Sequence, residues 1–353
     1  MITVVVPLFN DEAYIDSCLN SILSQSVEDI EVIVVDDGST DSSQDIVKKK
    51  IDQDSRVRLI SQKNSGLSAA RNAGIENARG DYIMFVDSDD ELYSNNSIEL
   101  LLNELQTSGA DAAIGSIKVQ YEANQEYQDS DNWYYKIKYS SAQLAEASVI
   151  QNFHASSCAA LFKMSVINGR QLRYPIGLHY EDAYWHWVYF TSCKKIAFTP
   201  EYVYRYYRRQ SSIMASTFSG NRIAIDHVFI AERIFDFWNE NHMWGKYKGA
   251  VKQILEDYFY FSFRYLPEWE KVRAVYECAR IIRKYEIDVS GSTTLRNISE
   301  GKIAFLFPDQ TVDSREYARY QQIKNKLNKL LPEGSYRRRF AYQFARKLWS
   351  IIK

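Results

Sequence analysis

The sequence has few cysteines and almost no net charge, and each shortage excludes a class of protein. Its four cysteines lie far apart and form no C-x-x-C pair, at Cys18, Cys158, Cys193 and Cys278. This spacing is typical of reduced residues in a cytosolic protein and not of a disulfide framework. Lysine and arginine number 43 against 45 for aspartate and glutamate, a formal net charge of −2 that argues against a dedicated nucleic-acid binder.

Long hydrophobic runs and a basic leader are also lacking. No apolar stretch approaches the roughly 18 residues needed to cross a bilayer. Met1 leads directly into a strand pattern without the basic segment of a signal peptide. We therefore expect a cytoplasmic chain that is either soluble or bound to a membrane surface. Its 353 residues are enough for a large core and predict more than one domain.

Apolar runs alternate with helical patterns along the first third of the chain. Runs that predict strands lie at 3–9, 31–35, 57–60, 82–86 and 112–119, and the run at 82–86 is typical of a strand buried on both faces. The helices predicted among them cover 15–23, after a cap at Asn10 or Asp11, then 67–78 and 97–107. Such alternation predicts an α/β fold, with a mostly parallel sheet covered by helices on both faces.

Two of these strands end in carboxylates. Asp36 and Asp37 follow the second strand, and Asp87, Asp89 and Asp90 follow the fourth. Right-handed crossovers bring both ends to one edge of the sheet, where open α/β folds bind ligands. Crowded carboxylates repel one another, and a divalent cation relieves this repulsion while also taking phosphate oxygens as ligands. The D-x-D spacing makes Asp87 and Asp89 the candidate metal ligands.

Each acidic motif taken alone has an ordinary structural explanation. The loop at 87–90 could be a solvated acidic turn, and Asp36-Asp37-Gly38-Ser39 could be a helix-capping turn. If the two motifs do form one site, Asp37 could accept a hydrogen bond from a nucleobase N–H and Asp36 one from a ribose hydroxyl. A nucleoside diphosphate with its metal would supply the positive charge that the cluster needs.

Four motifs in fixed order resemble a known family. They are V-V-V-P-L-F-N-D, V-V-D-D-G-S-T-D, N-S-G-L-S-A-A-R-N-A-G and F-V-D-S-D-D, and together they resemble the family 2 glycosyltransferases of GT-A fold over residues 1 to about 120. The resemblance implies that Asp37 contacts the base, usually uracil. It also implies that Asp87 and Asp89 contact ribose and bind Mn²⁺ or Mg²⁺. Arg71 matches a position near the nucleotide, although a helix-surface arginine is the alternative.

The donor site implied by this resemblance draws on all four motifs. Its expected members are Pro7, Phe9, Asn10, Glu12, Asp36, Asp37, Asn64, Gly66, Arg71, Asp87, Ser88 and Asp89. The acceptor and diphosphate side is expected to include Asp90, His179, Arg205, Arg208 and Arg209. Residues 121–139 are polar and aromatic without a clear period, and they form a candidate lid over the site.

Glycosyl transfer needs a base that takes the proton of the acceptor hydroxyl. The run G-L-H-Y-E-D resembles the family segment whose final Asp is that base, which makes Asp182 the predicted base and Glu181 the residue that orients it or the acceptor. Asp182 could also cap a helix over 183–191. We expect His179 to line the acceptor or to be structural, and not to bind a metal.

A basic and aromatic segment follows at 202–213. It resembles the family pattern Y-x-Y-R-x-R-x-x-S-I, which closes over the donor. Arginine forks suit phosphate oxygens, so Arg205 with Arg208 or Arg209 is expected to stabilise the departing diphosphate or to contact a phosphate on the acceptor. The alternative is a solvated basic strand edge.

The remainder of the chain reads as mainly helical. Helices are expected over 141–153, 223–237, 247–265, 271–285 and 317–331, and 288–313 is expected to be irregular. We predict a GT-A domain over 1–215, a helical domain over 216–334 and a basic amphipathic helix over 335–353. That last helix suits an anionic membrane surface. It could instead pack on its own protein or on a second subunit as a homodimer.

These patterns imply an inverting, metal-dependent hexosyltransferase that uses a nucleotide sugar, expected to be a UDP-sugar, with Mn²⁺ or Mg²⁺. The expected acceptor is a lipid-linked glycan of bacterial capsule, O-antigen or exopolysaccharide synthesis, at the inner face of the cell membrane. A catalytically silent nucleotide-sugar-binding scaffold in a polysaccharide-assembly complex is the alternative. The intact Glu181-Asp182 pair and D-x-D motif argue against that alternative.

Overall fold

The computed structural model describes residues 1–121, 136–208 and 222–301. The chain divides into two compact units, Met1–Gly291 and Ser292–Lys353. The predicted boundaries at 215 and 334, the helices over 317–331 and 335–353 and most of the predicted lid lie outside the described residues. Within those residues, no helix combines the length and the hydropathy of a membrane span. All four cysteines are free and buried, which confirms that they form no disulfides.

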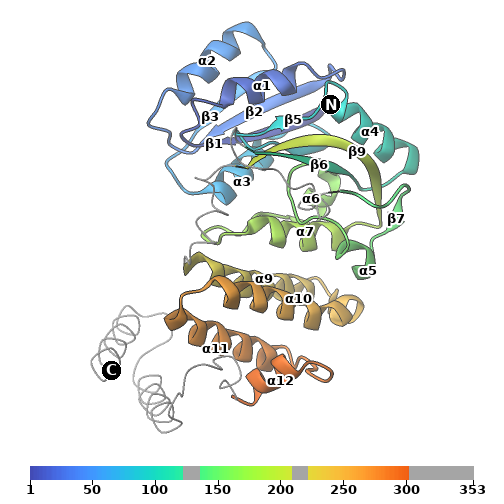
Figure 1. Cartoon of the computed structure of the whole chain (residues 1–353). Coiled ribbons are helices and arrows are strands. Elements are labelled where there is room, and N and C mark those ends of the chain that lie inside the picture. Colours follow the sequence, from blue (N-terminus) through green and yellow to red (C-terminus); the bar gives the residue numbers. More distant parts are fainter. Residues whose placement is uncertain (122–135, 209–221, 302–353) are drawn as a thin grey trace. The chain divides into compact units, whose positions relative to one another are not determined.

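The larger unit is built on a mixed sheet (Figure 1). Its described strands run in the order β3-β2-β1-β4-β8-β6-β9-β5, with β7 paired to β9. Their bounds are β1 (Ile2–Leu8), β2 (Ile30–Asp36), β3 (Val57–Ser61), β4 (Tyr82–Phe85), β5 (Glu91–Leu92), β6 (Ala112–Tyr121), β7 (Gln143–Leu144), β8 (Ala160–Lys163) and β9 (Lys195–Arg208). The first four strands are parallel, while β8 runs antiparallel between β4 and β6. The five predicted strands and the predicted α/β class are confirmed.

Helices cover both faces of this sheet. Successive side chains of a strand point to opposite faces, and in β1 and β2 every residue is buried, so both faces must be covered. On one face Val4, Val6 and Val34 pack in a core with α1 (Ile15–Leu23), α2 (Ser43–Gln53) and α4 (Ser97–Ser108). On the other face lie α3 (Leu67–Asn77), which carries Arg71, and α7 (Glu181–Ser192), which carries Glu181 and Asp182. Both catalytic candidates and Arg71 therefore approach the sheet from one side.

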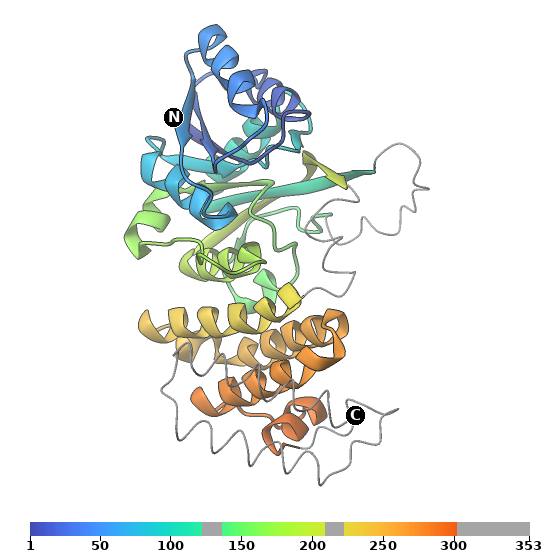
Figure 2. The ribbon, with the colours of Figure 1, turned by 90° about the vertical axis from the view of Figure 1, so that its left-hand side faces the viewer.

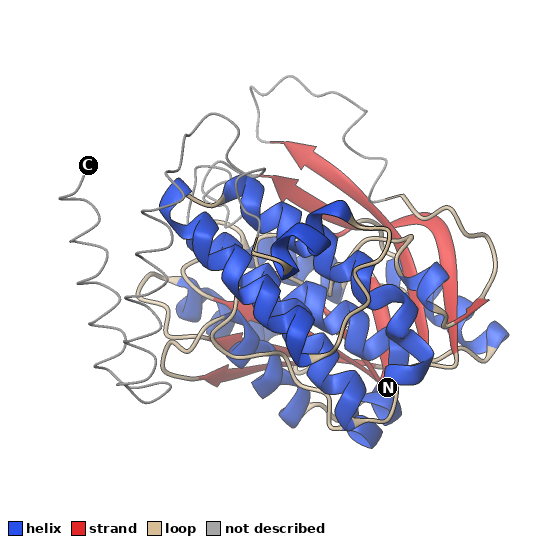
Figure 3. Ribbon diagram, turned by 90° about the horizontal axis from the view of Figure 1, so that it is seen from below, coloured by secondary structure: helices blue, strands red, loops and turns tan. Residues whose placement is uncertain are grey.

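A layer of helices continues beyond α7, in yellow and orange in Figure 2. It contains α9 (Asp226–Glu240), α10 (Trp244–Tyr265) and α11 (Glu268–Lys284), which confirms the three helices predicted in this region. A 3-10 turn, η2 (Arg222–Ile225), precedes them. Trp187 of α7 meets Trp238 of α9 edge to face at 5.7 Å between ring centroids. Trp238 Nε1 also donates to Thr191 Oγ1 at 3.0 Å. Figure 3 views the same helices, in blue, from below.

The predicted cap of the first helix was wrong. The helix begins at Ile15, and neither Asn10 nor Asp11 caps it. Asn10 has a left-handed φ of 56° and accepts a hydrogen bond from the Thr40 backbone N–H at 2.7 Å. Asp11 accepts one from the Ser88 hydroxyl. Both side chains are therefore taken by neighbouring loops, a tertiary contact that no local pattern reveals.

Two further local predictions were also wrong. The helix predicted over 141–153 is instead the short strand β7 followed by α5 (Ala147–Ile150), because 143–144 pairs with the edge of β9. A short helix, α6 (Met164–Arg170), follows β8. The region 288–313, predicted to be irregular, contains α12 (Thr293–Ser299). Ser292 caps that helix by accepting from the Leu295 backbone N–H at 3.1 Å.

The close approach of α3 to β1 gives a stability prediction. A Cβ added at Gly74 would lie 2.2 Å from Val5 Cγ1. We expect Gly74→Ala to lower the free energy of unfolding by about 1–3 kcal/mol, because an overpacked core must shift. Urea denaturation of the variant and the wild type measures this difference in the free energy of unfolding. The control is Gly249→Ala in α10, where nothing lies within 4 Å of the added carbon. Equal stability of the two variants would contradict the close packing.

Candidate active site

The candidate site lies where the loops after β1, β2 and β4 meet α3 and the start of α7. The register of β1 and β2 sets Leu8 opposite Asp36, so these strands end together. The loop that carries Asp87, Ser88, Asp89 and Asp90 follows β4 at the same edge. The predicted convergence of the two acidic strand ends is therefore what the fold produces.

Asp36 and Asp37 are both buried and hold the nearby loops. Asp37 Oδ1 accepts from Gln62 Nε2 at 2.7 Å and from the Ser65 backbone N–H at 2.8 Å, and its Oδ2 accepts from the Gly66 N–H at 2.8 Å. Asp36 accepts from the Ser39 N–H at 3.0 Å and from the Gln44 side chain. These bonds fix the shape of the predicted nucleotide pocket, while the contacts with base and ribose stay predictions.

The other donor candidates divide into framework and exposed residues. Asn10 and Glu12 join the first loop to the second, since Glu12 Oε2 accepts from the Ser42 N–H at 2.8 Å in addition to the Asn10 contact with Thr40. Pro7 is a buried residue of β1. Phe9, Asn64 and Gly66 are exposed, with Phe9 at 46%. Asn10 and Glu12 are exposed as well, so these residues also present surface that a ligand could contact directly.

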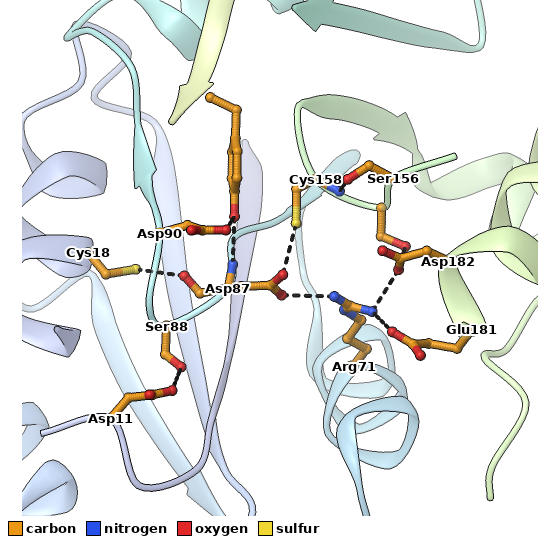
Figure 4. A network of polar contacts seen from close by, with 12 residues as sticks. Asp11, Cys18, Arg71, Asp87, Ser88, Asp90, Ser156, Cys158, Glu181 and Asp182 are labelled. Carbon is orange, nitrogen blue, oxygen red and sulfur yellow. Dashed lines mark hydrogen bonds and ion pairs between the residues drawn. The ribbon is translucent and has the colours of Figure 1, made fainter. Parts of the chain in front are cut away.

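Arg71 is the centre of the site (Figure 4). Its side chain is 1% exposed, and its guanidinium contacts three carboxylates. One terminal nitrogen donates to Glu181 Oε1 at 2.6 Å and to Asp182 Oδ1 at 2.9 Å, and the other donates to Asp87 Oδ1 at 2.8 Å. The resemblance placed Arg71 near the nucleotide, and the alternative of a surface arginine is wrong. Sequence reasoning did not foresee that it joins the D-x-D loop to the predicted base.

Among the residues that the structure describes, Arg71 is the one cation in contact with these three carboxylates. Glu181 shows the effect most clearly, since burial and repulsion from Asp182 raise its pKa above the usual range, against the opposing pull of Arg71. Coulomb interactions are strong in such water-poor surroundings. A further cation or a cationic ligand is therefore favoured close to this cluster.

Asp182 lies in the first turn of α7 but does not cap it. The capping position is Tyr180, whose φ of 62° is left-handed and whose side chain makes no cap bond. Asp182 Oδ1 accepts from both Arg71 and the Ser157 hydroxyl, the latter at 2.6 Å. Its side chain is still 30% exposed. A carboxylate that is oriented at one oxygen and open to solvent has the arrangement required of a general base.

The three aspartates after β4 have different surroundings. Asp87 contacts Arg71 and, through Oδ2, the Cys158 thiol at 3.5 Å. Asp89 is partly exposed. Asp90 is 1% exposed and accepts from the Tyr204 hydroxyl and the Tyr207 backbone N–H, both at 2.8 Å. Burial, with repulsion from its two neighbours, raises the pKa of Asp90 well above its usual range. Asp90 thus fastens the loop to β9.

The other acceptor-side candidates bond away from the Arg71 cluster. His179 Nδ1 lies 2.9 Å from Asp226 Oδ2 at the start of α9, and this bond raises the histidine pKa. Arg205 pairs with Glu91 at 2.8 Å. Arg208 donates to the Tyr121 hydroxyl at 3.0 Å, and Arg209 lies outside the described residues. Their proposed contacts with acceptor or diphosphate stay predictions.

Two members of the site were missed from the sequence. Ser157 and Cys158 precede β8 and contact Asp182 and Asp87 respectively. Neither belongs to one of the four motifs, and Cys158 stood out only as a reduced cysteine. No pattern in the sequence indicates these contacts, because they depend on where the segment before β8 lies in the folded chain.

The donor set around Asp87 fits a hard cation in part. In 1–121, 136–208 and 222–301, no group of three or more His, Cys, Asp or Glu side chains is arranged to hold an ion by itself. Mg²⁺ is commonly bound by one or two carboxylates and completed by substrate phosphates and water. Asp87 Oδ2 has only a weak thiol contact and Asp89 is partly exposed, so these two fit, whereas the buried Asp90 does not.

Comparison with known proteins agrees with this geometry. Residues 3–169 match the family described as Glycosyl transferase family 2. The chain is 34% identical over 233 residues to Glycosyltransferase GlyG of Streptococcus pneumoniae, a match that covers 62% of this chain and 74% of that protein. This chain belongs to glycosyl transferase family 2. The family 2 chain is also 33% identical over 264 residues to Glycosyltransferase GlyA of the same organism, spanning 72% of this chain but only 37% of GlyA.

A solved structure supports the fold of this family 2 glycosyltransferase. The structure of Staphylococcus aureus TarS 1-349 in complex with UDP-GlcNAc matches with a TM-score of 0.64 at 20% identity, over 86% of this chain and 88% of that one. At this identity the likeness speaks for the fold alone. The predicted GT-A fold, followed by a mainly helical region, is confirmed.

The Arg71 cluster predicts a pH-dependent loss of stability. We expect Arg71→Gln to cost about 3–5 kcal/mol near pH 8, because it leaves buried carboxylates without their cation. The deficit should shrink towards pH 5. The pKa of Glu181 is higher in the folded state than in the unfolded state, so deprotonation of this side chain lowers the free energy of unfolding as the pH rises. Urea denaturation at several pH values measures this trend.

The matched control is Arg173→Gln. Arg173 pairs with Glu76 at 3.5 Å, and both side chains are substantially exposed, at 39% and 61%. Such surface pairs contribute about 0–1 kcal/mol. A deficit for Arg71→Gln that equals the control, or that grows as the pH falls, would contradict the charge balance described for the cluster.

Proposed function

We propose that this family 2 glycosyltransferase is an inverting, metal-dependent hexosyltransferase that moves a sugar from a UDP-sugar to a hydroxyl of a glycan acceptor. The observation that carries the proposal is Asp182, which is oriented through Oδ1 by Arg71 and Ser157 and whose side chain is 30% exposed. The same guanidinium contacts Asp87 of the D-x-D loop. The predicted base and the predicted donor site thus share one buried cation.

In this mechanism Asp182 takes the proton of the acceptor hydroxyl while that oxygen attacks the anomeric carbon. The bond from the anomeric carbon to the diphosphate oxygen breaks, and the nucleoside diphosphate leaves with the bonding electrons. A single displacement from the opposite face inverts the configuration. Arg71 keeps the base in register with the donor loop, which lowers the entropic part of the barrier. Glu181 shares the Arg71 nitrogen that contacts Asp182 and so orients it.

Asp87 and Asp89 would hold the Mn²⁺ or Mg²⁺ ion, and a bound ion would offset negative charge on the leaving diphosphate. The shortage of positive charge around Arg71 supports this assignment. Asp37 and Asp36 would recognise base and ribose from the edge of the sheet. Arg205 and Arg208 would contact phosphate only after rearranging, since they bond to Glu91 and Tyr121 here. Arg209, outside the described residues, is the third proposed phosphate contact.

The proposed acceptor is a lipid-linked glycan of capsule, O-antigen or exopolysaccharide assembly. We propose that the enzyme meets it in the cytoplasm, at the inner face of the cell membrane, through the basic residues of 335–353. That segment lies outside the described residues, and a homodimer through it is the alternative. The UDP-GlcNAc bound to the structural neighbour TarS supports a UDP-sugar donor by analogy of fold.

The donor proposal is tested by slow hydrolysis without acceptor. We expect the full chain, given Mn²⁺ and a panel of UDP-sugars, to release UDP from one sugar faster than from the others. EDTA should abolish the release, because the charge on the leaving diphosphate would no longer be offset. Asp89→Ala should weaken Mn²⁺-dependent UDP binding in calorimetry. Release that continues in EDTA, or unchanged affinity in Asp89→Ala, would contradict the metal assignment.

The base proposal is tested by Asp182→Asn. The amide keeps the shape of the side chain but cannot take a proton, so transfer to acceptor should fall by about 100-fold or more. Affinity for UDP should stay within about twofold of wild type, because binding energy and proton transfer are separable contributions. Full transfer activity in this variant would remove Asp182 from the role of base.

A further inference from the structure

Two consecutive residues, Ser157 and Cys158, contact both of the carboxylates that Arg71 joins. The Ser157 hydroxyl donates to Asp182 Oδ1 at 2.6 Å, and the Cys158 thiol lies 3.5 Å from Asp87 Oδ2. Both residues are buried, and Ser157 is 0% exposed. The predicted base and the donor loop are therefore connected twice, from α3 by a charged side chain and from the start of β8 by neutral ones.

The sheet fixes this second connection. Strand β8 is antiparallel to β4, with Tyr82 opposite Lys163 and Ile83 opposite Phe162. Cys158 lies two residues before β8, and its thiol reaches Asp87 Oδ2 at 3.5 Å in the loop after β4. Ala159 has a left-handed φ of 57°, and its carbonyl accepts from the Gly115 N–H at 3.0 Å. The backbone just before β8 is thus tied to β6 at Ala159, and this bond fixes the place from which the Ser157 side chain extends.

The two donors to Asp182 converge on the same oxygen. Oδ1 accepts from Ser157 and from Arg71, at 2.6 and 2.9 Å, and these bonds occupy both of its lone-pair directions. Among the residues that the structure describes, no hydrogen bond reaches Oδ2. A carboxylate with one saturated oxygen can take a proton only at the other.

We propose that Ser157 is a positioning residue for the base. It holds Oδ1 against Arg71 and so presents Oδ2 to the acceptor hydroxyl. This inference rests on the proposed function, in which Asp182 removes the acceptor proton. The Arg71 nitrogen that reaches Oδ1 also donates to Glu181, whereas the single hydroxyl proton of Ser157 is donated to Oδ1. The Ser157 hydroxyl therefore helps to orient the Asp182 carboxylate and leaves the net charge of the site unchanged.

The test compares Ser157→Ala with Ser157→Thr in the full-length enzyme, by UDP release from the selected donor with water as the acceptor. We expect Ser157→Ala to lower kcat for transfer by about 10- to 100-fold, since the Asp182 carboxylate would no longer be aligned with the proton that it takes. The donor KM and the affinity for UDP should stay unchanged. Ser157→Thr, which keeps the hydroxyl, should recover most of kcat. Ser156→Ala is the control, because the Ser156 hydroxyl accepts from the Cys158 N–H and contacts neither acid.

The outcomes separate this inference from the proposed function. Wild-type kcat in Ser157→Ala, with Asp182→Asn inactive, would overturn the role of Ser157 and leave the base in place. Activity in Asp182→Asn would remove the base itself. A loss of UDP affinity that matches the loss of kcat would make Ser157 merely structural. A crystal structure of Ser157→Ala gives a readout that needs no turnover: an Asp182 side chain in its wild-type orientation would also overturn the proposal.

Discussion

The buried guanidinium of Arg71 is the interaction on which the rest of the site depends. It brings together three acidic side chains, the buried Glu181 and the partly exposed Asp87 and Asp182, whose charges would otherwise repel one another. Arg71 belongs to a helix that follows the third strand, whereas its partners follow the fourth strand and begin a helix more than a hundred residues later. The Arg71 guanidinium therefore joins segments that are far apart in the sequence, and it also offsets the negative charge of its three partners.

The topology of the sheet explains why these residues meet. Parallel strands β1, β2 and β4 end at one edge, and the antiparallel strand β8 begins there because its direction is reversed. Gly74 lets α3 lie close enough to β1 for Arg71 to reach that edge. The site thus has a rigid sheet edge on one side and two helices on the other, which is the kind of support that precise catalytic geometry requires.

The sequence predicted the strands and their acidic ends, which depend on residues close together in the chain. Continuous apolar runs gave the buried strands, and acidic residues at their ends marked the edge that binds ligands. Helix starts were less predictable, since Asn10 and Asp11 are good capping residues that instead bond to Thr40 and Ser88. The helix predicted over 141–153 was lost to edge pairing with β9. Ser157 could not be found at all, because its place in the site comes from a tertiary contact with Asp182 that no local pattern reveals.

The three aspartates after β4 show how one short motif serves different purposes. Asp87 is bound to the Arg71 guanidinium, Asp90 is buried among donors from β9, and Asp89 is partly exposed. Asp87, Asp89 and Asp182 are three carboxylates at a site where, among the described residues, Arg71 is the arginine that contacts the predicted base and the D-x-D loop. A site with that imbalance favours a donor that arrives with its own divalent cation over a bare diphosphate, which would add to the repulsion. The acidity of the site is therefore itself an argument for a metal-bound donor.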